Sequence, residues 1–190
     1  LFTEIMRLSR EEQRRYLEEQ TETKQIAYSG VPGAYSECAV VGFFGDDCER
    51  VNFKTFEEVF ATVADGKARY GVVPVENSSS GSINDVYDLL GKYACHIVGE
   101  QLVRVEHCLL GVPGAKLSDI TQVFSHEQGF AQCPKFLGEH PDWVTTPYFN
   151  TAIAARHVAE MGDKQYAAIA SRLAAKHYGL EILAPDIHTF

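Results

Sequence analysis

Short apolar runs alternate with longer amphipathic stretches along residues 25–190. The apolar runs have the length of buried strands and lie at residues 26–28, 70–75, 107–112, 121–124 and 167–170. The amphipathic stretches have the length of helices and lie at residues 35–44, 55–64, 82–91, 126–137, 151–161 and 171–178. This alternation predicts an α/β fold with mixed, mostly parallel sheets. The long extended run at residues 96–105 is suited to carry the chain from one lobe to another.

Residues 1–24 have a different pattern. They contain eleven charged residues and neither glycine nor proline, and their apolar side chains fall along one narrow helical stripe. The pattern predicts an N-terminal helical arm. Such an arm either packs on a partner that the rest of the chain does not supply or is a solvated helix, and the spacing favours neither.

Composition narrows the classes of partner. The 190 residues carry a formal net charge of −9, with 45% hydrophobic and 23% charged residues. An acidic chain without a long basic block is not expected to bind nucleic acid or an anionic membrane. No apolar run approaches the roughly 18 residues of a membrane span, and the charged N-terminus does not resemble a signal peptide.

The cysteines and histidines show no ligand pattern. The five cysteines are odd in number and widely spaced, which predicts reduced thiols in a cytoplasmic protein. The seven histidines lack metal-ligand spacing, so no structural metal is expected.

Small hydroxyl and amide residues mark four strand-to-helix junctions, at residues 29–36, 77–82, 125–128 and 150–151. In an open α/β sheet such junctions lie at the carboxyl ends of strands, where ligands bind. Each exposes helix N–H groups that attract an anion. A single junction is most simply a helix cap, whereas four together favour a shared cleft for a small carboxylate or phosphate.

These junctions also carry a family resemblance. Six motifs occur in order: IAYSGVPGAYS from residue 26, GVVPVENSSSGSI from 71, IVGE from 97, HCLL from 107, SHEQ from 125 with AQC from 131, and AAIAS from 167. Over residues 25–187 the chain resembles prephenate dehydratases. Residues 1–9 look like the end of the last helix of a chorismate mutase domain, which precedes the dehydratase in bifunctional enzymes.

The resemblance implies a two-lobed fold like type II periplasmic binding proteins. Lobe 1 would take residues 25–100 with a C-terminal return at 180–190, and lobe 2 residues 101–179, after a mutase-like tail at 1–24. The full-length protein is expected to be a homodimer. The ACT domain that senses phenylalanine in the family is not expected within this chain.

The implied reaction is the decarboxylating dehydration of prephenate to phenylpyruvate, carbon dioxide and water. Aromatisation drives it, so neither a metal nor an organic cofactor is expected. The family's catalytic threonine, in a T-x-x-A-A motif, corresponds to Thr151. Its hydroxyl would donate a hydrogen bond to the departing oxygen, although the pattern alone also fits a helix cap. Glu76 and His126 are the alternative acids, and Glu76 could equally be structural.

The other expected site residues bind substrate. Many relatives read T-R-D-T where this chain has YFNT, so Asn150 is the nearest substitute for the missing arginine and aspartate. Arg172 could add an anion contact or be merely exposed. Glu127, Gly129 and Phe130 also depart from the family's pattern. The expected substrate-binding residues are Gly33, Tyr35, Ser36, Asn77, Ser78, Ser79, Ser80, Gly81, Ser125, Gln128, Asn150 and Ser171.

Two other functions fit the same residues. Arogenate dehydratase acts on the amino analogue of prephenate, and the sequence does not separate the two substrates. A non-catalytic carboxylate-binding module of this fold is the alternative from another class.

Overall fold

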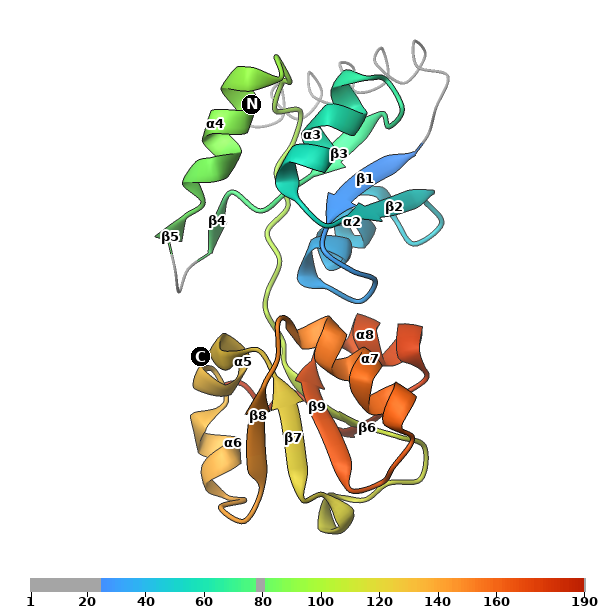
Figure 1. Cartoon of the computed structure of the whole chain (residues 1–190), viewed down its shortest axis with the longest axis vertical. Helices are drawn as coiled ribbons and strands as arrows, with labels where there is room; N and C mark the ends of the chain where they lie inside the picture. Colours follow the sequence, from blue (N-terminus) through green and yellow to red (C-terminus); the bar gives the residue numbers. More distant parts are fainter. Residues whose placement is uncertain (1–24, 78–80, 190) are drawn as a thin grey trace, which may run out of the picture. The chain divides into compact units, whose positions relative to one another are not determined.

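The computed structural model describes residues 25–77 and 81–189, without the side chain of Asn77, so the predicted N-terminal arm lies outside the described residues. The chain divides into two compact units, each with its own sheet (Figure 1). Of the described residues, the first unit contains residues 25–30 and those within 39–102, and the second contains Val31–Cys38 and residues 103–189. The predicted α/β class with mixed sheets is confirmed.

The first unit is built on a three-stranded parallel sheet in the order β2-β1-β3. The central strand β1 is fully buried: Ile26 and Tyr28 contact Val40, while Ala27 packs with Val59 on the other face. A short hairpin, β4 and β5, leads into α4. The bounds are β1 Ile26–Ser29, α2 Tyr35–Phe44, β2 Arg50–Phe53, α3 Phe56–Ala64, β3 Tyr70–Val72, β4 Glu76–Asn77, β5 Gly81–Ser82 and α4 Asn84–Lys92.

The second unit contains a five-stranded sheet in the order β10-β6-β9-β7-β8. Strands β7, β8 and β9 are parallel, whereas β6 runs antiparallel to β9 and β10 antiparallel to β6. The bounds are β6 Cys108–Gly111, a 3₁₀ turn Leu117–Asp119, β7 Gln122–Ser125, α5 Glu127–Ala131, α6 Pro134–Gly138, β8 Val144–Pro147, α7 Thr151–Met161, β9 Tyr166–Ala170, α8 Arg172–Tyr178 and β10 Glu181–Ala184.

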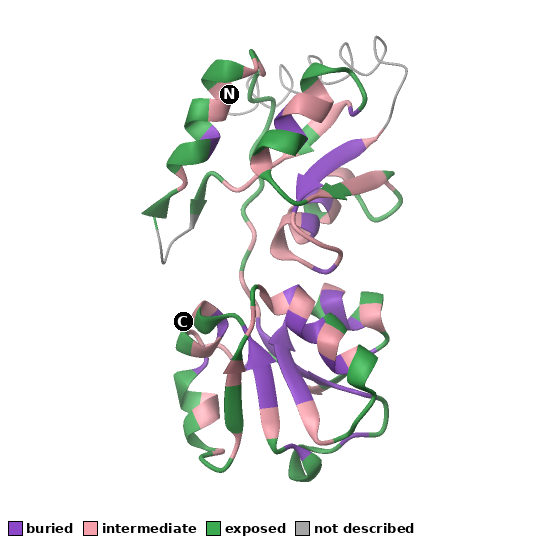
Figure 2. Cartoon of the chain, in the orientation of Figure 1, coloured by how far each residue is buried: buried purple, intermediate pink, exposed green. Residues whose placement is uncertain are grey.

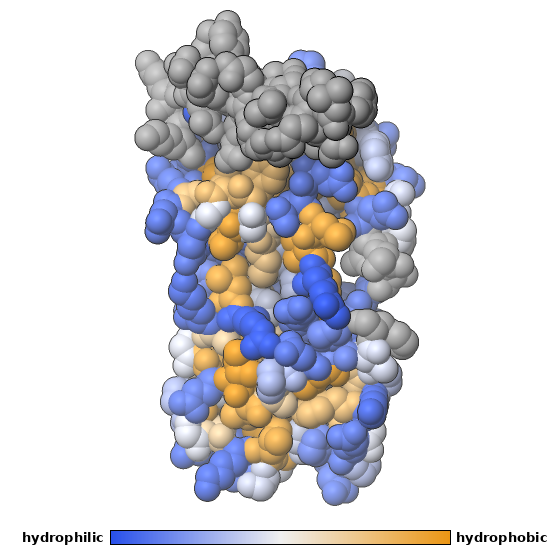
Figure 3. Space-filling model, turned by 180° about the vertical axis from the view of Figure 1, so that it is seen from behind, coloured by the Kyte–Doolittle hydropathy of each residue, from blue (hydrophilic) through white to orange (hydrophobic). Residues whose placement is uncertain are grey.

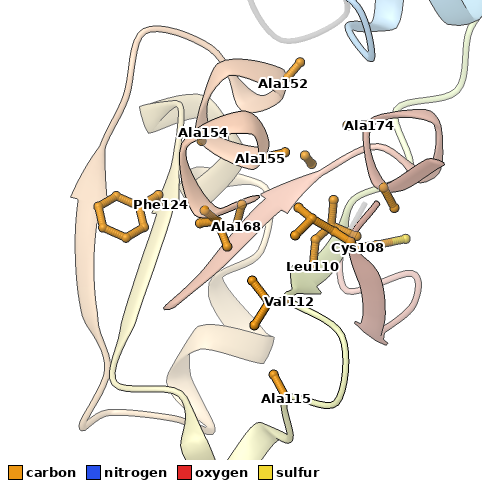
Figure 4. Close-up of a cluster of buried hydrophobic side chains, with 14 residues drawn as sticks. Cys108, Leu110, Val112, Ala115, Phe124, Ala152, Ala154, Ala155, Ala168 and Ala174 are labelled. Carbon is orange, nitrogen blue, oxygen red and sulfur yellow. The ribbon is translucent and has the colours of Figure 1, made fainter. Parts of the chain in front are cut away.

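Both faces of this sheet are covered. Helices α7 and α8 pack on one face through small side chains, with Ala152 and Ala155 of α7 beside Ala174 of α8 (Figure 4). The other face packs against α5, α6 and Ile187. The inner strands are therefore buried along nearly their whole length (Figure 2). Apolar side chains remain on the surface of each unit among polar ones (Figure 3), and Phe149 is 83% exposed.

The structure corrects three boundaries. Residues 180–190 were expected to return to the first lobe, but β10 pairs with β6 and so belongs to the second unit. The turn at residues 31–38 also belongs to the second unit by its contacts. The helix expected at residues 126–137 is two helices, because Pro134 cannot continue the backbone ladder of α5 and instead begins α6.

Candidate active site

One edge of the second sheet gathers most of the expected site residues. The carboxyl ends of β7, β8 and β9 lie at this edge, each followed by the first turn of a helix. Because β6 is antiparallel, its first residue Cys108 lies opposite Ala170, the last residue of β9, at the same edge. Parallel strands thus bring three separated stretches of sequence together here.

At the β8–α7 junction, Asn150 caps the helix and Thr151 begins it. Asn150 is the N-cap of α7, and its Oδ1 accepts the N–H of Ile153 at 2.7 Å. Thr151 is therefore the first helical residue and does not act as the cap. Among the described residues, no hydrogen-bond partner is seen for its hydroxyl, and its methyl carbon faces Gly129. This arrangement leaves the Thr151 hydroxyl available to a ligand.

At the β7–α5 junction, Ser125 is buried and its Oγ donates to the carbonyl of Ile169 on β9 at 2.9 Å. Its own carbonyl accepts the N–H of Tyr148 at 2.7 Å, which joins this junction to the β8–α7 junction. The hydroxyl proton of Ser125 is thus used within the sheet, and its expected contact with substrate stays a prediction. Gln128, also expected to bind substrate, is half-buried in the first turn of α5.

His126 is the N-cap of α5. Its Nδ1 accepts the N–H of Gln128 at 3.2 Å, which requires Nδ1 to be unprotonated. In this state any proton that His126 offers resides on Nε2. The side chain is exposed, so the structure retains it as a candidate acid.

At the β9–α8 junction, Ser171 is fully engaged. Its buried Oγ accepts the N–H of Ala174 at 3.0 Å, as the N-cap of α8, and donates to the carbonyl of Gly33 at 2.7 Å. Gly33 has a φ of +84°, and a Cβ on it would lie 2.7 Å from Cα of Ala174. Ser171 and Gly33 therefore fasten the turn at residues 31–38 to α8.

A buried carboxylate completes this fastening. Glu37 is 1% exposed and accepts the N–H of Gly33 at 2.6 Å. Its carboxylate also lies 2.9 Å from Nε2 of His177 on α8. A buried carboxylate is costly without partners, so these contacts fix the position of the first turn of α2, which carries Ser36, itself half-buried.

Tyr35 begins a second buried chain of contacts. Its hydroxyl lies 2.9 Å from Nδ1 of His107 and 3.1 Å from the carbonyl of Glu106. Nε2 of His107 lies 2.8 Å from Oε1 of Gln132, an acceptor, so Nε2 of the neutral ring carries the proton and Nδ1 is an acceptor that shares the Tyr35 hydroxyl with the carbonyl of Glu106. Burial lowers the pKa of His107 and raises the pKa of Tyr35, which keeps both groups neutral.

The thiols near Tyr35 and His107 are protonated, because burial raises their pKa values. Burial raises the pKa of Cys38 and of Cys108, and it raises the pKa of Cys133 to about 12. All five cysteines are unpaired. Within residues 25–77 and 81–189, no cluster of His, Cys, Asp or Glu could hold a metal ion, and no helix is long and apolar enough to cross a membrane.

The remaining candidates belong to the first unit. Glu76 is exposed on β4, which argues against a buried structural carboxylate. Asn77 pairs with Gly81, whose φ of +79° is a conformation that glycine adopts without strain. Ser78, Ser79 and Ser80 lie outside the described residues.

Comparison with known proteins places the chain in a family. Residues 26–190 match the family model described as prephenate dehydratase. The chain belongs to the prephenate dehydratase family. It is 40% identical over 162 residues to the bifunctional chorismate mutase/prephenate dehydratase of Escherichia coli K12, covering 84% of this chain and 42% of that protein.

A plant relative carries a second substrate, arogenate, in its name beside prephenate. The chain is 44% identical over 164 residues to arogenate dehydratase/prephenate dehydratase 6 of Arabidopsis thaliana, covering 86% of this chain and 40% of that protein. The chain therefore spans about two fifths of the curated relatives it matches.

Two solved structures share the fold. Prephenate dehydratase from Arthrobacter aurescens, in complex with L-Phe, matches with a TM-score of 0.77 and 30% identity, over 86% of this chain and 55% of that chain. A protein described as GqqA, a novel type of quorum quenching acylase, matches with a TM-score of 0.80 and 38% identity, over 86% and 59%.

Sequence reasoning missed the polar contacts that hold the edge together, in which buried Glu37 and His107 meet the more exposed His177 and Gln132. Glu37 and His177 are 140 positions apart, and nothing local marks them as a pair. Gln132 was quoted only as part of a motif, although it contacts His107. Only Glu37 carries a sequence signal, as an acidic residue within the otherwise apolar start of α2.

Proposed function

We propose that this chain carries the decarboxylating dehydration of prephenate to phenylpyruvate, carbon dioxide and water. The observation that carries the proposal is Thr151, which matches the family's catalytic threonine and stands at the start of α7 with its capping role taken by Asn150. The family match over residues 26–190 supports the same reaction.

The chemistry requires a donor where the ring hydroxyl departs. As the ring carboxylate leaves as carbon dioxide, its electrons form the aromatic ring and expel the hydroxyl, which takes up a proton to become water. The Thr151 hydroxyl donates a hydrogen bond to the departing oxygen at the positive end of α7. No electrons are exchanged with a cofactor, because aromatisation supplies the driving force.

His126 and Glu76 are the competing proton donors. His126 lies at the same edge as Thr151 and carries any available proton on Nε2 while it caps α5. Glu76 is exposed and follows the motif that precedes the serine turn. We propose Asn77, Ser78, Ser79, Ser80, Gly81, Gln128 and Ser36 as substrate-binding residues, whereas Ser125, Asn150, Ser171, Gly33 and Tyr35 support the site through the contacts described above.

The substrate is prephenate or its amino analogue arogenate. Identity does not separate them, since relatives named for either substrate match at 40 to 44%. Both lose the same ring carboxylate and hydroxyl, so the mechanism is common to them.

The test is product formation by the 190-residue chain from prephenate and, in parallel, from arogenate. Thr145 on β8 is exposed, so Thr145→Ala is the control. Turnover that is lost in Thr151→Ala and retained in Thr145→Ala would establish the reaction and its principal residue. Undiminished turnover in Thr151→Ala would refute the role of Thr151. Tight binding of prephenate without any product would favour the non-catalytic binding module.

A second candidate activity follows from the likeness to GqqA. An acylase cleaves an amide by water, so an N-acyl amide belongs in the same assay as a third substrate. Release of a free acid from that amide, without turnover of prephenate or arogenate, would favour this candidate.

We further propose that the protein is cytoplasmic, supported by five unpaired cysteines, and that the full-length protein is a homodimer. The tail at residues 1–24 is proposed as the end of a chorismate mutase domain, supported by the bifunctional relative. Light scattering on the full-length protein tests the homodimer, an assay of it with chorismate tests the mutase domain, and cell fractionation tests the cytoplasmic location.

A further inference from the structure

Arg172 is a cation at the edge of the sheet that the proposed reaction has not used. Within the first turns of α5, α7 and α8, which follow β7, β8 and β9, it is the single lysine or arginine. It is the first residue of α8, directly after the buried Ser171. Its position is therefore fixed by a cap that also holds the turn at Gly33.

The guanidinium of Arg172 already holds a carboxylate. Its Nη2 donates to Oδ1 of Asp186 at 2.7 Å, and the two side chains are 47% and 54% exposed. Half-exposed pairs of this kind contribute little to stability because water and salt screen them. Water, or another carboxylate, can therefore replace Asp186 as the partner of Arg172 at a small cost in free energy.

Asp186 belongs to a segment that crosses the edge of the sheet. This segment, residues 185–189, is bound through the N–H of Ile187 to the carbonyl of His107, at 2.9 Å, and through the N–H of Thr189 to the carbonyl of Gln132. Asp186 itself has a φ of +52°, a conformation that non-glycine residues seldom adopt. The pairing of β10 with β6 before Asp186, and the two backbone bonds after it, hold its carboxylate in front of Arg172.

The substrate brings two carboxylates to a site with few cations. Tyr148, Phe149 and Asn150 are all uncharged, so the loop before α7 supplies no charge partner. Helix α8 packs beside α7, and both begin at this edge, with Ala152 and Ala174 in one cluster (Figure 4). Arg172 is thus placed to provide the missing charge.

Chemistry decides which carboxylate it would hold. The ring carboxylate must lose its charge as it leaves, so a guanidinium on it would stabilise the ground state more than the transition state and slow the reaction. The side-chain carboxylate keeps its charge throughout and appears unchanged in the product. An arginine bound to this group contributes uniform binding to substrate and transition state.

We propose that Arg172 binds the retained side-chain carboxylate of the substrate, and that Asp186 occupies Arg172 when no substrate is bound. The proposal rests on the proposed function, since it names the substrate group that Arg172 recognises. The same carboxylate occurs in prephenate and arogenate, so the effect is expected with either substrate.

The experiment compares Arg172→Gln with Asp186→Asn. If Arg172 binds substrate, the two variants should change KM in opposite directions, whereas a structural ion pair predicts the same direction for both. Arg172→Gln should raise KM by about 10- to 100-fold, the range for losing a charged hydrogen-bonded contact, with little change in kcat. Asp186→Asn should lower KM by about two- to fivefold, because a competing carboxylate is removed. Asparagine is suitable here since it tolerates a positive φ.

Arg156→Gln and Glu160→Gln are the matched controls. This pair is also half-exposed, at 48% and 67%, but lies along α7 beyond its first turn, and its variants should leave KM unchanged. If Arg172→Gln and Asp186→Asn both leave KM unchanged, or both raise it, Arg172 is only a structural partner and the proposal is wrong.

Calorimetric binding of phenylpyruvate separates this proposal from the proposed function. Phenylpyruvate retains the carboxylate in question, and Arg172→Gln should weaken its binding by the same factor as it raises KM. If the parent chain turns over neither substrate, the proposed function fails, yet this weakening would still support Arg172. Unweakened binding in Arg172→Gln, or no binding of phenylpyruvate to the parent chain, would overturn the role of Arg172.

Discussion

The β8–α7 and β9–α8 junctions look alike in sequence and differ in what their side chains do. Each places a small polar residue before a helix that packs on the same face of the second sheet. At β9–α8, the hydroxyl of Ser171 is consumed as donor to Gly33 and as acceptor from Ala174. At β8–α7, Asn150 takes the cap, and the hydroxyl of Thr151 stands one residue further on.

At a helix start, the N-cap residue and the residue after it are free to do different things. A residue at the N-cap position spends its side chain on the helix, whereas the next residue does not need to. The β9–α8 junction is therefore a fastening point, and the β8–α7 junction can serve a ligand. Substitutions that affect rate at one junction and stability at the other will test this contrast.

Thr151→Val should have the largest effect of the single changes. It keeps the shape and the methyl contact beside Gly129 but removes the hydroxyl, so kcat should fall by about 100- to 1,000-fold, the range for losing one oriented donor. Steady-state turnover measures this. Thr151→Ser should retain much of the rate, and a thermal melt should show little loss of stability in either variant. Equal rates for Val and Ser would remove the distinction between the junctions.

Ser171→Ala should instead cost stability, by about 2 to 3 kcal/mol, because it removes the cap of α8 and leaves the buried carbonyl of Gly33 without its donor. Urea unfolding measures this. Turnover by the folded fraction should be close to normal as long as the turn at residues 31–38 stays docked. A variant as stable as the parent would contradict the fastening role.

Gly129→Ala should destabilise by about 1 to 2 kcal/mol through overpacking. The added Cβ would lie 2.5 Å from Oγ of Ser125, and that hydroxyl would have to leave the carbonyl of Ile169. Adding Ser125→Ala removes the clash, so the two changes together should cost less than the sum of each alone. Strict additivity in unfolding experiments would show that the contact is not a clash.

Asn150→Ala should have the smallest effect, about 1 kcal/mol of stability, because one capping hydrogen bond is lost from α7. Asn150→Asp should keep the cap and lose little, as measured by the same unfolding experiment. A fall in rate for Asn150→Ala as large as that for Thr151→Val would mean that Asn150 also contacts the substrate.

Much of the fold could be predicted because its strands and helices carry local signals. The apolar run at residues 107–112 and the alanine-rich run at 167–170 became β6 and β9, and Gly162 and Gly179 end α7 and α8 in the left-handed conformation. The strands β2, β8 and β10 escaped notice because their exposed or half-exposed positions carry polar residues such as Asn52 and Glu181. Such strands are defined by their neighbours.

The site was predictable only where a motif named a residue. Thr151 came from the family's pattern, and the structure shows why it is not the cap. Ser125 and Ser171 were expected to bind substrate, yet their hydroxyls contact backbone groups 44 and 138 positions away. Local sequence carries no record of such partners, because they meet only when the sheet has formed.

The segment at residues 185–189 has a mechanical consequence. Its contacts follow one another along the chain. Backbone N–H groups of Thr189 and Ile187 donate to the carbonyls of Gln132 and His107, and Asp186 accepts from Arg172. The ladder of β10 with β6 lies before all of these residues in the chain. A force on Thr189 directed away from the sheet would load these contacts one at a time, so they would break in sequence. The segment would peel at low force, and Arg172 would lose its internal carboxylate before any strand left the sheet.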